Sequence, residues 1–221
     1  MSIVGNINKL HSELPEGVRL VAVSKFHPVD ELRQAYDAGQ RLFGESRVQE
    51  LLDKIPQLPC DIHWHFIGHL QTNKVRHLIG KTTLIESVDS EKLIELIDRE
   101  SERAGVVTNV LVQVHVAREE TKFGFLPDEL LEYFSQRKFR TLKATRICGV
   151  MGMASNTDDT ERVCSDFREI RAVFDRIRQL CPDLEGFDIV SMGMSGDWKL
   201  AVDEGSNLVR VGTMIFGPRE Y

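Results

Sequence analysis

The segment Leu20-Val21-Ala22-Val23-Ser24-Lys25 places four apolar residues in succession before a serine and a lysine. An uninterrupted apolar run is typical of a parallel strand buried on both faces, because a strand with one face in water alternates apolar and polar residues. Pro28 then opens a stretch with helical spacing, Val29–Ala38, and Gly39 ends it. The segment therefore predicts a buried parallel strand followed by a helix.

The same pairing of strand and helix recurs along the chain. Apolar, β-branched runs between turn residues predict eight strands: Leu20–Lys25, Leu42–Ser46, His63–Gly68, Thr83–Val88, Asn109–Val116, Ile147–Met153, Asp188–Met194 and Leu208–Phe216. Start and stop signals predict helices between them, at Val29–Ala38, Glu91–Ala104, Asp128–Gln136 and Asp158–Leu180. Eight such units predict an α/β fold, a single (β/α)8 TIM-type barrel over residues 1–221 with short loops, since these barrels typically have about 250 residues.

An open, doubly wound sheet is the competing architecture. Such a sheet normally carries a Gly-rich phosphate loop after its first strand. Here the first strand runs into Ser24-Lys25-Phe26-His27-Pro28, which contains no glycine. The barrel is therefore the favoured fold.

The composition is that of a globular protein, with 42% hydrophobic and 28% charged residues, which excludes collagen, coiled coils and disordered chains. The formal net charge of −6 provides no global positive field for nucleic acid or anionic lipid. No apolar run approaches the ~20 residues of a membrane helix, and the amino end lacks the apolar core of a signal peptide. The four cysteines form no C-x-x-C pair and are typical of reduced thiols: Cys60, Cys148, Cys164 and Cys181. We therefore expect a cytoplasmic protein that binds neither nucleic acid nor membranes.

Lys25 ends the first predicted strand, one serine after its apolar run, where a barrel strand reaches the mouth of a packed core. Burial disfavours the charged form of a lysine, and a neutral amine is a nucleophile towards carbonyl groups. The alternative is a lysine whose ammonium group extends into solvent just past the strand. The choice between the two depends on the rest of the chain.

The last two strands end in Ser191-Met192-Gly193-Met194-Ser195 and Arg210-Val211-Gly212-Thr213. In barrels of this class the loops after strands seven and eight frequently form a phosphate site, where small residues let backbone N–H groups approach the anion. Ser195-Gly196-Asp197 also indicates a helix start. Each glycine alone is equally compatible with a plain turn, but two such motifs at the two expected strand ends favour a phosphate site.

A closed barrel makes strand eight the neighbour of strand one, so this phosphate would lie beside the amine of Lys25. An amine for an aldehyde and a backbone cradle for a phosphate together describe a site for pyridoxal 5′-phosphate (PLP). Arg210 lies two residues before Gly212, on the same face of the strand. Because arginine keeps its proton, Arg210 facing the pyridine nitrogen would keep that nitrogen unprotonated and weaken the ring as an electron sink. Such a site would hold the cofactor better than it would drive carbanion chemistry.

Several motifs then occur together from about Leu20 to Gly217: Val23-Ser24-Lys25, Phe43-Gly44-Glu45, His65-Phe66-Ile67-Gly68, Leu70-Gln71, Asn73-Lys74, Gly149-Val150-Met151, Ser191-Met192-Gly193-Met194-Ser195 and Val209-Arg210-Val211-Gly212-Thr213 with Ile215-Phe216-Gly217. In this combination the sequence resembles the pyridoxal phosphate homeostasis proteins. The resemblance implies a barrel related to the amino-terminal domain of alanine racemases, with a PLP aldimine on Lys25. It also implies that the protein buffers the cofactor or delivers it to apo-enzymes, with no known substrate turned over.

By similarity to the racemase motif of strand eight, Arg210 would lie against the pyridine nitrogen, and Gly212, Thr213 and Ser195 would hold the phosphate. The candidate cofactor-binding residues are Lys25, His65, Ser191, Gly193, Ser195, Arg210, Gly212 and Thr213. No catalytic residue and no metal ligand is assigned.

Three positions depart from the pattern of that family. Ser46 follows Phe43-Gly44-Glu45 where the family usually has asparagine, so its shorter hydroxyl group has less reach. His115 stands where the family tends to have asparagine, and Phe123 follows Lys122 where a small residue is expected. The last two fall near the loop after the fifth strand, so they bear on contacts at that side of the ring and leave Lys25 and the phosphate side unchanged.

His63, His65 and His69 invite a metal interpretation, because alternate residues of a strand present two imidazoles to one face. Spacing fixes no third ligand. A histidine hydrogen-bonded within the barrel is therefore the preferred interpretation of His65.

Two rival functions stay open. A PLP-dependent amino-acid racemase of this barrel type needs an opposing acid or base from a second, β-rich domain across a dimer, and only Arg219, Glu220 and Tyr221 follow Pro218. A barrel that binds another phosphorylated metabolite would use Lys25 only to pair charge. The leading hypothesis is a monomeric or weakly associating barrel that holds PLP on Lys25 and manages its supply to apo-enzymes.

Overall fold

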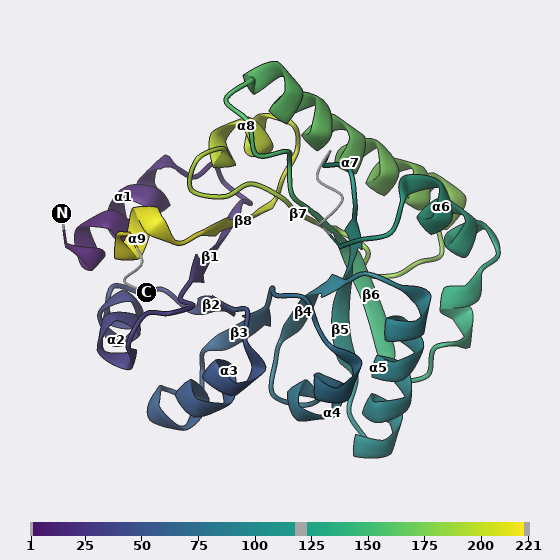
Figure 1. Cartoon of the computed structure of the whole chain (residues 1–221), viewed down its shortest axis with the longest axis horizontal. Helices are drawn as coiled ribbons and strands as arrows, with labels where there is room; N and C mark the ends of the chain where they lie inside the picture. Colours follow the sequence, from purple (N-terminus) through teal and green to yellow (C-terminus); the bar gives the residue numbers. More distant parts are fainter. Residues whose placement is uncertain (1, 118–122, 219–221) are drawn as a thin grey trace.

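The structure, a computed structural model, describes residues 2–117 and 123–218. Eight parallel strands follow one another around a closed barrel, in which β8 pairs with β1 (Figure 1). Their bounds are β1 (Arg19–Val23), β2 (Leu42–Glu45), β3 (His63–Phe66), β4 (Leu84–Val88), β5 (Thr108–Val114), β6 (Thr145–Gly152), β7 (Ile189–Ser191) and β8 (Leu208–Val211). The predicted (β/α)8 barrel is confirmed. Lys122, Arg219, Glu220 and Tyr221, on which expectations above depend, lie outside the described residues.

Helices surround the strands as an outer layer (Figure 1). Their bounds are α1 (Ile3–Glu13), α2 (Val29–Asp37), α3 (Val48–Lys54), α4 (Val75–Leu78), α5 (Glu91–Ala104), α6 (Pro127–Ser135), α7 (Thr160–Leu180), α8 (Trp198–Asp203) and α9 (Thr213–Phe216). Helix α5 has the predicted bounds because Ser90 caps its first turn and Gly105 ends it in the left-handed conformation, with φ of 66°. No helix in the described part of the chain has both the length and the apolar character of a membrane span.

The apolar strands are buried on both faces, as the sequence of β1 predicts. Leu20 and Ala22 belong to the core between the barrel wall and the helices. Val21 points the other way and packs inside the barrel with side chains from five other strands: Leu84, Leu111, Cys148, Met151, Ile189 and Leu208. The period of two along each strand therefore decides which residues face the barrel interior, where the site is built.

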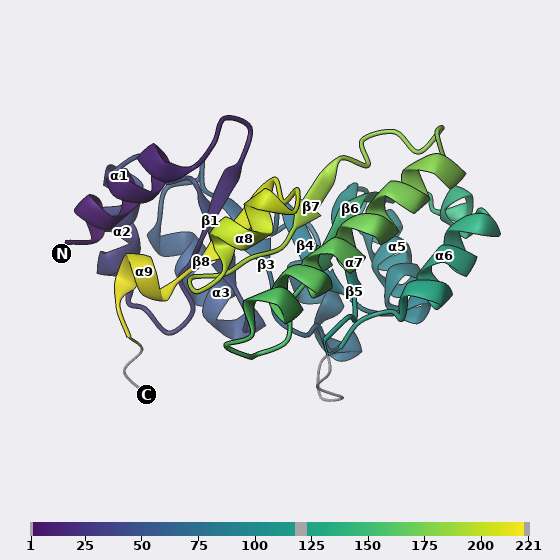
Figure 2. The ribbon, with the colours of Figure 1, turned by 90° about the horizontal axis from the view of Figure 1, so that it is seen from above.

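The predicted strand Leu208–Phe216 is wrong in its second half. Strand β8 ends at Val211, and Thr213–Phe216 form the short helix α9, in which the N–H groups of Ile215 and Phe216 donate to the carbonyl of Gly212 at 2.8 and 3.0 Å. A four-residue helix is too short to show helical periodicity, so its apolar residues resemble a continued strand. Helix α9 packs beside α1, where Asn6 Nδ2 donates to the Ile215 carbonyl at 2.9 Å (Figures 1 and 2).

The predicted strand Thr83–Val88 ends where β4 ends, and the other six run past the observed carboxyl ends by one to three residues. Strand β1 ends at Val23 and not at Lys25, and β7 ends at Ser191 and not at Met194. The residues predicted as strand but found outside the sheet, such as Lys25, lie at the rim of the barrel. The error in the strand ends therefore falls on the segments that position the site.

Candidate functional site

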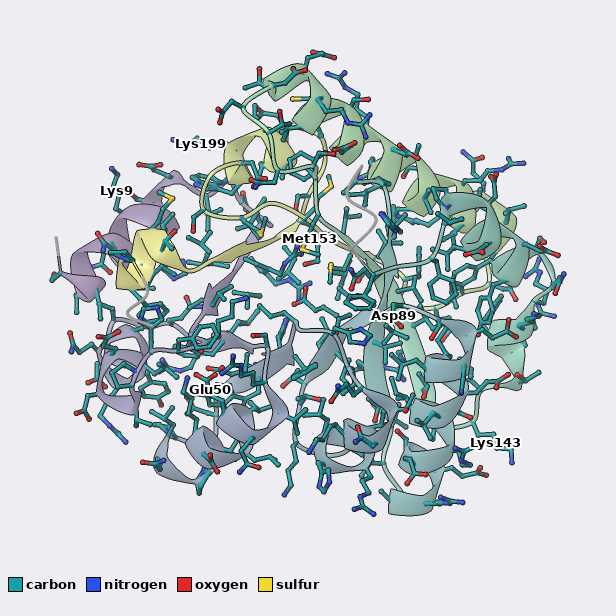
Figure 3. The ribbon with its side chains drawn as sticks, in the orientation of Figure 1. Lys9, Glu50, Asp89, Lys143, Met153 and Lys199 are labelled. Carbon is teal, nitrogen blue, oxygen red and sulfur yellow. The ribbon has the colours of Figure 1, made fainter. Side chains whose placement is uncertain are left out.

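A cavity of about 260 Å³ opens at the carboxyl ends of β1, β7 and β8. Its described lining consists of Val23, Lys25, Ile67, Met151, Met153, Met194, Ser195, Gly196, Arg210, Gly212 and Thr213. Met153 lies towards the centre of the barrel in Figure 3. Five of the eight predicted cofactor-binding residues therefore share one cavity: Lys25, Ser195, Arg210, Gly212 and Thr213.

A larger hollow of about 550 Å³ adjoins this cavity through Met153, Met194 and Gly196. Its described lining, in the loops before α7 and α8, contains no lysine, arginine or histidine. A phosphate ester with an aldehyde needs an amine and a positive charge, so the smaller cavity is the candidate site for such a ligand.

Lys25 is half-buried and lies two residues beyond the end of β1. Val21, Val23 and Lys25 alternate along the chain, so the direction of the strand brings the lysine to the inner rim. Directly after it, Phe26 has a positive φ of 70°, and its N–H donates to Glu50 Oε1 at 2.6 Å. The backbone therefore turns sharply away from the barrel just past the lysine.

The phosphate side of the cavity is built from small residues. A Cβ atom added to Gly212 would lie 3.1 Å from the Val23 carbonyl oxygen, which is closer than an ordinary contact, so a larger residue here would require β8 and the end of β1 to move slightly apart. The N–H of Gly212 donates to Ser195 Oγ at 3.2 Å, which joins the β7 and β8 loops. Ser195 and Thr213 both line the cavity together with Gly212.

The predicted helix start at Ser195-Gly196-Asp197 is displaced to its third residue. Asp197 occupies the cap position of α8, and its Oδ1 accepts the N–H of Met194 at 2.5 Å. Gly193, a predicted cofactor-binding residue, does not line the cavity. It has a φ of 94°, and a Cβ there would lie 2.5 Å from Ala201 Cβ, so this glycine allows α8 to pack closely on the strand.

Arg210 is 4% exposed and forms part of the inner cavity wall. Its two terminal nitrogens donate to Ser191 Oγ at 2.5 Å and to the Gly152 carbonyl at 2.9 Å. Burial lowers the pKa of this guanidinium, while the nearby Glu86 carboxylate, 3.7 Å away, opposes the shift. Arginine is not deprotonated in proteins, even when it is buried, so Arg210 gives the cavity wall a fixed positive charge.

Glu86 is a residue of this site that sequence reasoning missed. It is fully buried on β4 and accepts hydrogen bonds from His65 Nδ1 and Ser191 Oγ, both at 2.6 Å. Burial alone would raise the pKa of Glu86, but His65, Arg210 and Ser191 together lower it below the ordinary value. The signal in the sequence was an acid within the apolar strand Leu84-Ile85-Glu86-Ser87-Val88.

His65 and Ser191, both predicted as cofactor-binding, lie below the cavity and not in its described lining. His65 bonds to Glu86, which confirms the interpretation as a histidine hydrogen-bonded within the barrel. His63 is exposed at the opening residue of β3, and His69 bonds to Asp89 at 2.9 Å. Among residues 2–117 and 123–218, no three potential metal ligands are grouped.

A second buried ionic cluster was also missed, on the outer side of the barrel wall. Lys54 Nζ donates to Glu45 Oε1, Glu50 Oε1 and the Ser24 carbonyl at 2.8, 2.7 and 2.9 Å. Burial raises the pKa of Glu45, partly offset by Lys54. Glu50 lies with α3 outside the strands in Figure 3. This cluster fixes the backbone on both sides of Lys25, at Ser24 and at Phe26.

The three departures from the expected pattern lie away from the described lining of the cavity. His115 Nε2 is 3.0 Å from the Ala117 carbonyl oxygen, and Phe123 stacks on His69 with ring centroids 3.6 Å apart. The backbone of Ser46 packs against Gly68, where an added Cβ would lie 2.2 Å from the Ser46 oxygen. Ser46 belongs to the loop after β2, and His115 and Phe123 belong to the loop after β5.

Comparison with known proteins first defines the class. Residues 2–220 match the family described as alanine racemase, N-terminal domain. Alanine racemases from Clostridium difficile 630 and E. faecalis share the fold, with TM-scores of 0.78 and 0.74 at 14% and 19% identity, and the chain covers 57% of each. The chain therefore belongs to the family of alanine racemase N-terminal domains, and its fold is a racemase-type barrel.

Closer relatives define the particular family. Pyridoxal phosphate homeostasis proteins of Aquifex aeolicus and Schizosaccharomyces pombe are 38% and 40% identical, over 92% and 91% of this chain and 88% and 84% of theirs. PipY of Synechococcus elongatus PCC7942, solved without PLP, has a TM-score of 0.93 at 38% identity over 98% of this chain and all of its own. The same protein has also been solved with PLP bound, with a TM-score of 0.90 at 37% identity over 98% of this chain and all of its own. The chain belongs to the pyridoxal phosphate homeostasis proteins.

Proposed function

We propose that the protein binds PLP in the cavity at the carboxyl ends of β1, β7 and β8 and holds it as a Schiff base on Lys25. In this proposal it acts in PLP homeostasis in the cytoplasm, as a single-domain barrel that works as a monomer, and buffers the cofactor or delivers it to apo-enzymes. The observation that carries the proposal is the single cavity shared by Lys25, Ser195, Gly212 and Thr213.

The residues of the cavity fit the cofactor chemically. PLP supplies an aldehyde that an amine attacks and a ring that withdraws electrons. Lys25 offers the amine, and the hydroxyl groups of Ser195 and Thr213 offer hydrogen-bond donors to the phosphate. The relatives named as pyridoxal phosphate homeostasis proteins and the PLP-bound PipY structure support this choice of ligand.

Arg210 favours storage of the cofactor over turnover. A guanidinium that cannot release its proton would leave an adjacent pyridine nitrogen unprotonated, and an unprotonated ring stabilises a carbanion poorly. Storage and delivery do not require a stabilised carbanion. The proposed role therefore agrees with the positive charge on the cavity wall.

The test is an absorbance scan of the full-length protein with PLP, followed by borohydride reduction and peptide mapping. We expect a visible band and a reduced adduct on Lys25, both lost in Lys25→Ala and retained in Lys143→Ala, which removes a lysine on the outer surface (Figure 3). A wild-type protein that yields no adduct on Lys25 would overturn the proposal.

Two further measurements separate the rival functions. Turnover of D- or L-alanine at ordinary enzyme rates would favour a racemase over a homeostasis protein. Binding of another phosphate ester by Lys25→Ala, with no Lys25 adduct in the wild type, would favour a different phosphorylated metabolite. Delivery predicts that the loaded wild-type protein restores activity to a PLP-dependent apo-enzyme faster than free PLP at the same concentration.

A further inference from the structure

Four buried polar side chains form a continuous chain of hydrogen bonds beneath the cavity, from β3 across β4 and β7 to β8. His65 Nδ1 lies 2.6 Å from Glu86 Oε1, and Ser191 Oγ lies 2.6 Å from Glu86 Oε2. Arg210 then donates to Ser191 Oγ at 2.5 Å. Only the Arg210 end of this chain belongs to the described lining of the cavity.

The chemistry of the four groups fixes the direction of each bond. Arginine can only donate, and an ionised carboxylate can only accept. Ser191 has one hydroxyl proton, so it accepts from Arg210 and donates to Glu86. The lowered pKa of Glu86 agrees with an ionised carboxylate, and its other oxygen accepts the Nδ1 proton of His65. Each member therefore orients the next.

The result is a guanidinium held in one place from two sides. One terminal nitrogen of Arg210 is bonded to Ser191 and the other to the Gly152 carbonyl at 2.9 Å. Glu86 Oε2 lies 3.7 Å from the first nitrogen and balances its charge. Two anchors on β6 and β7 leave the planar group little freedom to rotate.

The apolar surroundings of Glu86 and Arg210 argue against a purely structural role for these two charges. The interior next to the chain is apolar, formed by Leu84, Met151, Ile189 and Leu208 among others. Placing a carboxylate and a guanidinium there carries a large desolvation cost, and apolar residues of similar volume would stabilise a fold at least as well. The link from Glu86 through Ser191 to Arg210, which lines the cavity, gives these charges a use that apolar residues could not serve.

We propose that Glu86 is a positioning residue that acts through Ser191 to hold the Arg210 guanidinium against the bound ligand, with His65 fixing the carboxylate. The inference rests on the proposed function, since PLP is the ligand that Arg210 would face. It extends the functional unit to a histidine and an acid that line no part of the described cavity.

The test compares Glu86→Gln, which removes the charge and retains the size, with Ser191→Ala, which breaks the hydrogen-bonded link and retains both charges. The matched control is Asp98→Asn, because Asp98 on α5 is a buried carboxylate that accepts the backbone N–H groups of Lys143 and Ala144, just before β6 and outside the chain of hydrogen bonds. PLP affinity, the pH profile of the visible absorption of the bound cofactor, and the free energy of unfolding are measured for each.

We expect Glu86→Gln and Ser191→Ala each to weaken PLP affinity about tenfold, equivalent to about 1.4 kcal/mol, and to shift the pH profile in the same direction. Asp98→Asn should leave both unchanged. In an Arg210→Gln background, Glu86→Gln should change the affinity by less than about twofold, because a residue that acts through Arg210 has no effect without it.

The outcomes separate this inference from the proposed function. A wild-type protein without a reduced adduct on Lys25 would overturn the proposed function and the inference with it. A normal wild-type adduct, with Glu86→Gln or Ser191→Ala variants that match the wild type in affinity and pH profile, would overturn the inference alone. Lower stability of these variants with unchanged cofactor properties would show a merely structural role and would also overturn it.

Discussion

The ionic cluster outside the barrel wall and the one inside it flank the same cavity, but they act on different parts of the chain. Outside, Lys54 binds two carboxylates and the Ser24 carbonyl, and so fixes the backbone next to Lys25. Inside, Glu86 fixes the side chain of Arg210 through a serine. The outer cluster therefore positions the backbone next to Lys25, and the inner cluster positions the guanidinium of Arg210.

The difference shows in how the charges are balanced. In the outer cluster one ammonium group faces two carboxylates, and Glu45 Oε2 is buried without a hydrogen-bond partner. In the inner cluster each oxygen of the Glu86 carboxylate accepts a hydrogen bond. Because Glu45 Oε2 has no other partner, the negative charge of the outer cluster is balanced by Lys54 alone. The outer cluster therefore depends more on a single residue than the inner cluster does.

The largest effect is expected from Lys54→Met, which removes the only positive charge of the outer cluster. The variant leaves two carboxylates beneath Lys25 without their partner, and breaking a buried ion pair on one side typically costs about 3–5 kcal/mol. Urea unfolding of the full-length protein measures the loss. The control is Lys143→Met, whose ammonium bonds to Glu102 on the exposed surface and should cost much less. Equal losses for the two variants would contradict the assigned role of Lys54.

Gly212→Ala tests the seam between β8, which carries Arg210, and β1, whose end the outer cluster holds. The new methyl group would lie 3.1 Å from the Val23 carbonyl oxygen, so the two strands must separate slightly next to Lys25. We expect a loss of about 1–3 kcal/mol in the free energy of unfolding, as for other overpacked sites, together with weaker PLP binding.

The matched control for this variant is Gly105→Ala at the end of α5. Its φ of 66° makes the substitution costly, although an added Cβ there meets no atom within 4 Å. This control should lose stability while its PLP affinity stays at the wild-type value. If Gly212→Ala also keeps full affinity, the close approach of β8 and β1 is not a requirement of the site.

The pH dependence of stability should have opposite signs in the two clusters. The pKa of Glu86 is lowered in the folded state, so its contribution is present above the ordinary value of 4.5 and is lost as the pH falls through the folded pKa. The pKa of Glu45 is raised, so folding becomes less favourable as the pH rises from 4.5 through the folded pKa.

Urea unfolding over a series of pH values checks both signs. The advantage of the wild type over Glu86→Gln should shrink as the pH falls below 4.5. Against Glu45→Gln the wild type should instead gain as the pH falls towards 4.5. If the wild type gains or loses stability relative to both variants in the same direction as the pH falls, the two clusters do not have opposite pH dependence.

The barrel and the cavity lining could be predicted because both follow from local patterns. Continuous apolar runs define the strands, and the period of two places Arg210 and Gly212 on one face. Lys25 and Ser195 lie two and four residues beyond the ends of β1 and β7. The cavity therefore gathers residues whose positions along the chain already indicate the rim of a barrel.

Neither cluster could be predicted in full, because the contacts that tie each one to the site join residues distant in the sequence. Ser191 and Glu86 are 105 residues apart, and Lys54 reaches Ser24 across 30 residues. A buried acid such as Glu86 is visible as an exception within an apolar strand, but no spacing rule names its partner. Helix α9 was missed for the opposite reason, since four residues are too few to show a period.

The smallest effect is expected from Phe123→Ala, at the rim after β5. Phe123 is 51% exposed and stacks on His69, which in turn bonds to Asp89, so neither ionic cluster and no described residue of the cavity lining depends on it. The free energy of unfolding should therefore change by no more than about 0.5 kcal/mol, and PLP affinity should stay at the wild-type value. Titration with PLP and urea unfolding check the two expectations. A clear loss of affinity would place this rim among the determinants of binding and would show that the β5 side contributes alongside the β8–β1 seam.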